Sequence, residues 1–412
     1  MEKMNKVLRS HTFYEAAFIA VIAFSLLLWL AAIFKNGFHS SQFDLFFGRC
    51  ADFFADMINC VGYSSQKDVY HNTMYTGTYE KIYPALPYII TYCFSKLVDM
   101  SKYWEANYFL HMYQEPFFLI IFLIFLFVVL LMIYECIRFY KNGNSLVKIG
   151  CAAACVLSMP VIFTIERGNL LLVSEFFLMY FIFFYDNGNK IVRETSLLAL
   201  AAAFAFKLTP AVFGILLLYD RKIKEAVRAA VYALFLGVVP FLFFEGGLSN
   251  IRTMFQNISD SGAAYTDATG TPLYACFLAL GMEGSDPRRQ FIRIVTYVVC
   301  LLIVLGGFWG SKWEKAMGVS IVLMILPSRS GSYCIIYLIP AMILFLNEAE
   351  HRISDLLVLF AILLCMYHIQ WPGRQWFDYH LGIILLMLLM MCRGIYRMYI
   401  FLKDKKIGAV LG

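Results

Sequence analysis

The sequence predicts an all-α fold, a polytopic bundle of transmembrane helices. Of the 412 residues, 61% are hydrophobic and only 15% are charged, whereas charged residues make up roughly 25% of an average soluble domain. A helix needs about 20 apolar residues to cross the hydrocarbon core, and such stretches recur almost from end to end. We expect about 11 to 13 of them, within a single integral membrane domain of residues 1–412.

The basic residues indicate the topology of the chain. The net charge is +6, but lysines and arginines stand in short clusters between apolar runs, so nucleic acid is not an expected partner and membrane lipids are. Lys3, Lys6 and Arg9 precede the first span, residues 13–34, and the positive-inside rule therefore places this end in the cytoplasm. No small-residue cleavage site follows the span, which is expected to be a retained signal anchor.

Two long polar stretches interrupt the apolar pattern. Residues 35–83 form a first outer loop, in which aromatic residues are expected to hold helices at the membrane interface. Residues 245–290 form a second long loop, expected to be an ordered flap. The other candidate spans are residues 84–97, 116–138, 147–165, 170–185, 197–206, 210–219, 226–244, 291–309, 316–326, 332–346, 354–367 and 379–401.

Two irregularities are expected among these segments. Segments 197–206 and 210–219 are each too short to cross, and with Lys207 between them they predict a broken or re-entrant pair. Basic residues flank the pair on both sides, which places both flanks in the cytoplasm and the tip away from it. Arg138 and Lys141 also favour the cytoplasm. Counting the predicted spans in order from the N-terminus does not place them on that side of the membrane. One segment before Arg138 is therefore miscounted or re-entrant.

The first outer loop carries two acids. Asp52 and Asp56 are four residues apart, on one face of any helix that forms there, and Asn59 follows Asp56 by one turn. A carboxylate beside apolar aromatic residues at an interface suits a general base. The alternative is a solvated amphipathic turn in which Arg49 pairs with Asp52, and spacing alone favours this plainer interpretation.

A short polar turn separates two later apolar runs. Glu166, Arg167, Gly168 and Asn169 predict a tight turn at a membrane face, where an ionised pair is costly unless it is neutralised or used. A functional interpretation is that Arg167 holds a phosphate through two parallel hydrogen bonds. The alternative is that both charged side chains extend to the surface, while Gly168 supplies the positive φ of a hairpin turn.

Other isolated charges lie at or within apolar runs. Lys207 stands at the predicted helix break and Arg329 interrupts a further run. Cations in such places mark candidate sites, although a long side chain also reaches a nearby surface. Glu175 is interpreted as a satisfied structural partner within its segment. No histidine or cysteine spacing matches a metal site, and no phosphate-binding glycine loop is present.

Taken in order, these motifs resemble the GT-C class of integral membrane glycosyltransferases, and within it the family 87 polyprenol-phosphate-mannose-dependent mannosyltransferases. The matching elements cover roughly residues 40–250. They are a loop aspartate, then Tyr70 and Tyr83-Pro84, then Gly168-Asn169 opening a span, then Lys207-Leu208-Thr209-Pro210 and a basic turn at Arg221-Lys222. The family turn usually reads Gly-Gln-x-Asn, and the departure from it at residues 166–169 leaves the sugar and the acceptor open.

The resemblance implies transfer of a mannose-like hexose from a polyprenyl-phosphate donor to a lipid or glycan acceptor, with inversion. It implies a loop aspartate, Asp56 or Asp52, as general base. Cations that steady the departing phosphate would be Arg167, Lys207 and Arg329. Candidate substrate-binding residues are Asn59, Tyr70, Tyr83, Glu166 and Asn169.

The same resemblance implies a location and a cofactor requirement. An enzyme of this kind is expected in the bacterial cytoplasmic (inner) membrane, with its active site on the outer face, where it builds a cell-envelope glycan. No cofactor is expected, and the absence of an acidic D-x-D pair means that no divalent metal is demanded.

Two other classes of membrane protein stay open at this point. A transporter or flippase for lipid-linked oligosaccharides places ionisable groups near the midplane of repeated, interrupted helices, and this chain shows one Lys-Pro break without a convincing internal repeat. A membrane polymerase or ligase that uses the same lipid-phosphate donors is compatible with the same motifs. Acids gathered in an outer loop favour an enzyme over a carrier.

Overall fold

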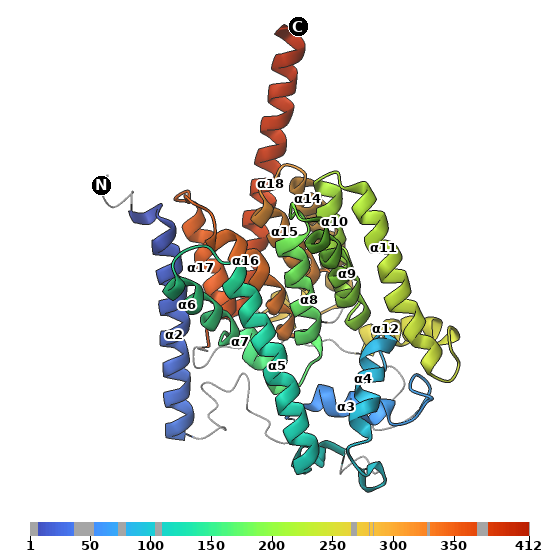
Figure 1. Ribbon diagram of the computed structural model, residues 1–412. Helices are drawn as coiled ribbons and strands as arrows, with labels where there is room; N and C mark the ends of the chain where they lie inside the picture. Colours follow the sequence, from blue (N-terminus) through green and yellow to red (C-terminus); the bar gives the residue numbers. More distant parts are fainter. Residues whose placement is uncertain are drawn as a thin grey trace. The chain divides into compact units, whose positions relative to one another are not determined.

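The computed structural model describes residues 7–36, 53–72, 80–103, 109–264, 270–279, 281–282, 284–327, 330–368 and 378–411. Every regular element among these residues is a helix (Figure 1), so the predicted all-α fold is confirmed. The chain divides into two compact units. Unit 1 takes Met1–Trp29, Lys141–Pro160 and Asp267–Gly412, and unit 2 takes Leu30–Tyr140 and Val161–Thr266.

Five helices of the described residues are long and apolar enough to cross a membrane, so the chain is a multi-pass membrane protein. They span His11–Lys35, Pro116–Tyr140, Ile223–Phe243, Pro287–Gly307 and Asp378–Lys403, and Ser145–Val156 with Met159–Glu166 gives a bent sixth candidate. Further apolar helices have 10–17 residues, fewer than the about 20 that a straight crossing needs. The total of about 11 to 13 spans stays a prediction.

Unit 2 is built on four helices, α5 (Pro116–Tyr140), α8 (Leu171–Phe184), α9 (Lys190–Phe206) and α11 (Ile223–Val238). Helix α9 packs between α8 and α11, and α5 packs against α8 (Figure 1). The shorter elements are α3 (Ala55–Ser64), α4 (Ala85–Ser95), η3 (Met100–Tyr103), η4 (Phe109–Gln114), α7 (Met159–Glu166), η5 (Thr209–Gly214), α10 (Ile215–Tyr219), η6 (Val239–Phe243) and α12 (Ser249–Ala264).

The basic flanks of the broken helical pair meet at one end of unit 2. Tyr185, after α8, donates a hydrogen bond to the carboxylate of Asp220 (2.8 Å), and Arg228 of α11 pairs with Glu194 of α9 (2.5 Å). The other end of α9 is the break itself, where Lys207 adopts an extended backbone. The predicted pair is therefore present, with both basic flanks at one end and Lys207 at the opposite end.

Helix α4 occupies the predicted span 84–97. It has 11 residues, which is about 16 Å of helix and too short for the hydrocarbon core. It packs against α3, α9 and α11 within unit 2. The predicted span 84–97 therefore holds a helix of only 11 residues, and the side of the membrane on which Arg138 lies stays a prediction.

Unit 1 contains most of the C-terminal helices. They are α6 (Ser145–Val156), α13 (Leu273–Ala279), α14 (Asp286–Gly307), α15 (Lys312–Ile325), η7 (Ser332–Tyr337), α16 (Leu338–Leu346), α17 (Asp355–Met366) and α18 (Asp378–Leu411), together with most of α2 (His11–Asn36). Helices α14 and α18 touch backbone to backbone, because a Cβ on Gly306 would lie 2.5 Å from Cα of Gly394. Small residues permit such close crossings in membranes.

A buried ion pair fastens the start of α2 inside unit 1. The ammonium of Lys141 lies 2.5 Å from a carboxylate oxygen of Glu15 and donates to the carbonyl oxygens of Asn142 and Leu346, each at 3.1 Å. Lys141 is 1% exposed and Glu15 is 4% exposed. Lys141 therefore has a structural role, because it neutralises an acid that has left water.

Candidate functional site

Backbone hydrogen bonds join the start of α3 to the polar turn that precedes α8. The N–H of Phe54 donates to the carbonyl of Glu166 (2.8 Å), and the N–H of Asp56 donates to the carbonyl of Arg167 (2.9 Å). Phe54 has φ 56°, in the left-handed region, so the chain turns sharply as α3 begins. The loop aspartate and the charged turn, which the sequence predicted separately, therefore lie together in unit 2.

The carboxylate of Asp56 is held on both oxygens. Oδ1 accepts hydrogen bonds from Nη2 (2.7 Å) and Nε (3.2 Å) of Arg167, and Oδ2 accepts one from Nδ2 of Asn169 (2.7 Å). Asn169 is itself fixed, since its Oδ1 accepts from the N–H of Leu171 at the start of α8 (2.9 Å). Asp56 is 19% and Arg167 21% exposed, so the result is an oriented carboxylate that still reaches the surface.

Gly168 permits this close approach. Its φ is +61°, and an added Cβ would lie 3.0 Å from Cβ of Met57, 3.1 Å from Cα of Phe54 and 3.2 Å from the ring of Phe122. A residue with a side chain would be strained at this φ and would also press on the backbone of Phe54. Glycine at this position is thus what lets the turn dock against α3.

For the sugar transfer that the motif resemblance implies, Gly168→Ala is expected to lower the rate by about 10-fold or more, because strain of about 1–2 kcal/mol must be relieved by moving the turn away from Asp56. The measurement is the transfer rate of the purified variant together with its melting temperature. Gly188→Ala is the matched control, because no atom lies within 4 Å of an added Cβ there. An unchanged rate in Gly168→Ala would show that the docking is dispensable.

Lys207 reaches the same region from the end of α9. Its ammonium lies 5.7 Å from the ring centroid of Tyr83. The thiol of Cys60, one turn after Asp56 on α3, lies within electrostatic reach of both groups: burial raises its pKa, Asp56 adds to the rise, and Lys207 opposes it. Lys207, at the predicted helix break, therefore lies in unit 2 with the loop aspartate and the polar turn.

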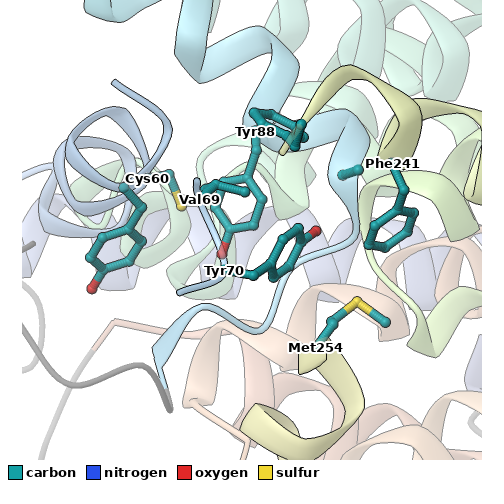
Figure 2. Close-up of a cluster of buried hydrophobic side chains, with 9 residues drawn as sticks. Cys60, Val69, Tyr70, Tyr88, Phe241 and Met254 are labelled. Carbon is teal, nitrogen blue, oxygen red and sulfur yellow. The ribbon is translucent and has the colours of Figure 1, made fainter. Parts of the chain in front are cut away.

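An aromatic cluster supports the site. It consists of Cys60, Tyr63, Val69, Tyr70, Ala85, Tyr88, Phe241, Phe244 and Met254, with Tyr83 and Leu208 packed against it. Figure 2 shows the ring of Tyr70 between Tyr88 of α4 and Phe241 of η6, and the rings of Tyr70 and Phe241 stack at 5.5 Å. Tyr70 is fully buried and donates to the carbonyl of Tyr83 (3.0 Å), so it positions Tyr83 from within the core.

The other predicted site residues differ in their exposure. Glu166 is buried and Asn169 is 1% exposed, whereas Asn59 and Tyr83 are partly exposed. Asp52 and Arg329 lie outside the described residues. Glu175 is fully buried in α8, and neither of its carboxylate oxygens has a hydrogen-bond partner in the described part of the chain, so its interpretation as a satisfied structural partner is wrong.

Sequence reasoning missed the pair Glu80 and Lys81. Lys81 is fully buried, with its ammonium 4.5 Å from the ring centroid of Tyr63. The hydroxyl of Tyr63 donates to Oε2 of Glu80 (3.2 Å). Burial lowers the pKa of Lys81 to about 8, although the neighbouring Glu80 opposes the change. Two opposite charges just before Tyr83-Pro84 were the available signal in the sequence.

This lowered pKa predicts how stability changes with pH. Between pH 8 and the ordinary lysine pKa near 10.4 the unfolded chain binds more protons at Lys81 than the folded protein does, so folding stability rises with pH in this window. Relative to Lys81→Met, the wild type is expected to gain on the order of 1–2 kcal/mol between pH 8 and 9.5. Thermal unfolding of both proteins in detergent at the two pH values measures the difference. Equal changes in the free energy of unfolding between the two pH values in both proteins would contradict this prediction.

Among the described residues, no three or more His, Cys, Asp or Glu side chains lie together in a way that could hold a metal ion. The arrangement in unit 2 instead combines a fixed carboxylate, two cations and partly exposed polar side chains at the end of a membrane helix bundle. Carboxylates of this kind remove protons from hydroxyl groups, and cations stabilise departing phosphates.

Comparison with protein families gives one match and places part of this site within it. The model of glycosyltransferase family 87 matches residues 108–328, more than half of the chain. The match includes Arg167, Asn169 and Lys207 but begins after Asp56, whereas the motif resemblance started near residue 40. No curated protein shows a significant match to the chain. The chain belongs to glycosyltransferase family 87, as the order of its motifs predicted, and it is a membrane glycosyltransferase.

Proposed function

We propose that this enzyme transfers a mannose-like hexose from a polyprenyl-phosphate donor to a hydroxyl group of a lipid or glycan acceptor, with inversion. Asp56 is the general base. The observation that supports this proposal most strongly is the carboxylate of Asp56, fixed by Arg167 and Asn169, with Lys207 in the same region of unit 2.

The hydrogen bonds of Asp56 leave room for a substrate. An ionised carboxylate has about four acceptor positions. Arg167 uses two of them on Oδ1 and Asn169 uses one on Oδ2. The remaining position on Oδ2 can accept the acceptor hydroxyl, in an orientation set by the side chain of Asn169.

The transfer is a single displacement at the anomeric carbon. The acceptor oxygen forms its bond to that carbon while the bond to the phosphate oxygen breaks, and the hydroxyl proton passes to Asp56. The leaving group is polyprenyl phosphate, whose charge Arg167 and Lys207 stabilise. Arg329 and Asp52 stay candidate second contributors to phosphate binding and proton removal. Attack opposite the leaving group inverts the anomeric configuration.

The distribution of charge supports an active site on the outer face. Lys190, Arg193, Arg221 and Lys224 lie at the end of unit 2 where α9 and α11 begin, and the positive-inside rule favours the cytoplasm for that end. Asp56 and Lys207 lie at the opposite end. A lipid-phosphate donor presented from the outer leaflet of a bacterial cytoplasmic membrane would meet the site directly. Asn59, Tyr83, Glu166 and Asn169 would contribute to substrate binding and positioning there.

Lys207→Met is expected to weaken donor use by about 10- to 100-fold in kcat/KM, the effect of losing a charge-assisted hydrogen bond to phosphate. Lys207→Arg should retain more activity because the cation persists. The assay uses the protein in lipid nanodiscs with radiolabelled polyprenyl-phosphate mannose. Lys224→Met, an exposed cation at the other end of the unit, is the matched control.

The same assay tests the function as a whole. Transfer from polyprenyl-phosphate mannose but not from a nucleotide-activated mannose is the expected result. Transfer from the nucleotide sugar, or no transfer from any of a series of polyprenyl-phosphate hexoses, would overturn the proposal. A flippase role would show instead as movement of a labelled lipid-linked sugar between leaflets without a new glycosidic bond.

A further inference from the structure

A lysine is held at the point where a membrane span of unit 2 ends. The span Ile223–Phe243 consists of α11 and η6. At its last residue, the ammonium of Lys67 donates a hydrogen bond to the carbonyl of Phe243 (3.2 Å) and lies 3.1 Å from the centroid of the Phe243 ring. The end of a span lies at the level of the lipid headgroups, so Lys67 places a positive charge at that level.

Tyr92 of α4 brings a second lysine to the same place. Its ring packs edge-on against the ring of Phe243, at 5.3 Å. The centroid of the Tyr92 ring lies 4.8 Å from the ammonium of Lys67 and 4.2 Å from that of Lys96, which caps α4. A lysine at the end of one helix is ordinary by itself. Here two like charges lie against one ring, each on a flexible stem.

Lys67, Tyr92 and Lys96 form a donor cluster that has no acid opposite it. Neither ammonium pairs with a carboxylate in the part of the chain that the structure describes, although the backbone N–H of Glu245 donates to the carbonyl of Lys67 (3.0 Å). The hydroxyl of Tyr92 makes no hydrogen bond to those residues either. Lys96 is exposed, and Lys67 and Tyr92 are partly exposed. The donor cluster therefore offers two cations and a hydroxyl to an anion from outside.

Apolar side chains are exposed on the chain beside Phe243. Leu242 is 63% exposed and Leu248 is 51% exposed. Leucines exposed at the end of a span contact the hydrocarbon chains of lipids. A ligand with an anionic head and acyl chains matches the donor cluster and these leucines together, whereas a free anion matches the donor cluster alone.

The donor cluster is separate from the cations of the proposed reaction. Those cations are Arg167, which contacts Asp56 at the start of α3, and Lys207. Lys67 follows the other end of α3, which has 10 residues and a length of about 15 Å. The ligand of the donor cluster is therefore a lipid other than the sugar donor.

We propose that the donor cluster binds the phosphate of an anionic phospholipid of the membrane. The two ammonium groups and the hydroxyl of Tyr92 donate hydrogen bonds to the phosphate oxygens, and an acyl chain lies against Leu242. This site goes beyond the proposed function, and no step of sugar transfer depends on it.

Native mass spectrometry of the purified protein in detergent measures the bound lipid directly. Phosphatidylglycerol and phosphatidylcholine with the same acyl chains are titrated into the wild type and into the double variant Lys67→Gln with Lys96→Gln. The wild type is expected to bind one phosphatidylglycerol in preference to phosphatidylcholine. The double variant should bind this lipid about 10- to 100-fold more weakly, the effect of losing charge-assisted hydrogen bonds.

Three further variants make the measurement specific. Lys102→Gln is the matched control, because Lys102 is also exposed but lies 3.8 Å from Glu115, and it should bind lipid as the wild type does. Lys67→Arg with Lys96→Arg keeps both cations and should keep the lipid. Lys96→Gln alone removes no hydrogen bond of its side chain to the described residues and should weaken binding several-fold, even if the double glutamine variant does not fold.

Competition identifies the source of the phosphate. Neither inorganic phosphate nor polyprenyl phosphate is expected to displace the bound phosphatidylglycerol. Displacement by inorganic phosphate would indicate a site for a free anion, and displacement by polyprenyl phosphate would assign the donor cluster to the sugar donor. Either result, or equal affinity for phosphatidylglycerol in the wild type and both glutamine variants, overturns the proposal. No turnover is needed for these measurements, so their outcome is independent of the proposed function.

Discussion

Asp56→Asn is expected to lower the rate of sugar transfer by about 10²- to 10⁴-fold, the range that a positioned general base contributes. The amide keeps the shape of the side chain but cannot take the proton of the acceptor hydroxyl. It also deprives Arg167 of a carboxylate partner at 2.7 Å. The quantity to measure is kcat with donor and acceptor both saturating, since the lost step is proton removal and not binding.

Two comparisons make this prediction specific. Asp99→Asn removes an exposed carboxylate that accepts hydrogen bonds from Ser101 and should leave kcat unchanged. Asp56→Asn itself should melt within a few degrees of the wild type, because α3 stays joined to the turn by the backbone bonds of Phe54 and Asp56. Full activity in Asp56→Asn would remove this carboxylate from the mechanism.

Lys141→Met is expected to destabilise unit 1 by about 3–5 kcal/mol, the usual effect of removing one partner of a buried ion pair. Glu15 would stay 4% exposed with a charge and no cation at 2.5 Å. The carbonyl oxygens of Asn142 and Leu346 would also lose a donor. Thermal unfolding in detergent should show a large drop in melting temperature.

The double variant Glu15→Gln with Lys141→Met tests the cause of this loss. If the isolated carboxylate is responsible, the second change should recover a large part of the stability, because no buried charge remains. Lys190→Met, which removes an exposed cation at the start of α9, is the control and should be close to neutral. A wild-type melting temperature for Lys141→Met would mean that the pair contributes little.

Local signals in the sequence predicted much of this protein. A lysine and a proline inside an apolar run predicted the break after α9, and the charges that flank the pair lie at one end of unit 2, as the pattern predicted. Hydropathy does not decide whether the short helix α4 crosses the membrane, because a short apolar run has the same composition whether it crosses or returns. The distinction depends on length, and prolines and tyrosines around residues 83–88 extended the apparent segment.

The contacts of the site were harder to predict because they join distant parts of the chain. Asp56 and Arg167 are 111 residues apart, and their local patterns predict separate roles, base and phosphate ligand, with no sign that they pair. Glu80 and Lys81 are adjacent opposite charges, and their spacing alone does not distinguish a solvated turn from a buried pair. Only packing shows that Lys81 is fully buried, because burial depends on α12 and on Tyr63 of α3.

The two backbone bonds that tie Phe54 and Asp56 to the turn at Glu166 and Arg167 have a consequence for protein engineering. They anchor the start of α3 to the segment ahead of α8 through main-chain atoms only. Side-chain substitutions at positions 54 and 167 are therefore expected to leave this anchor in place.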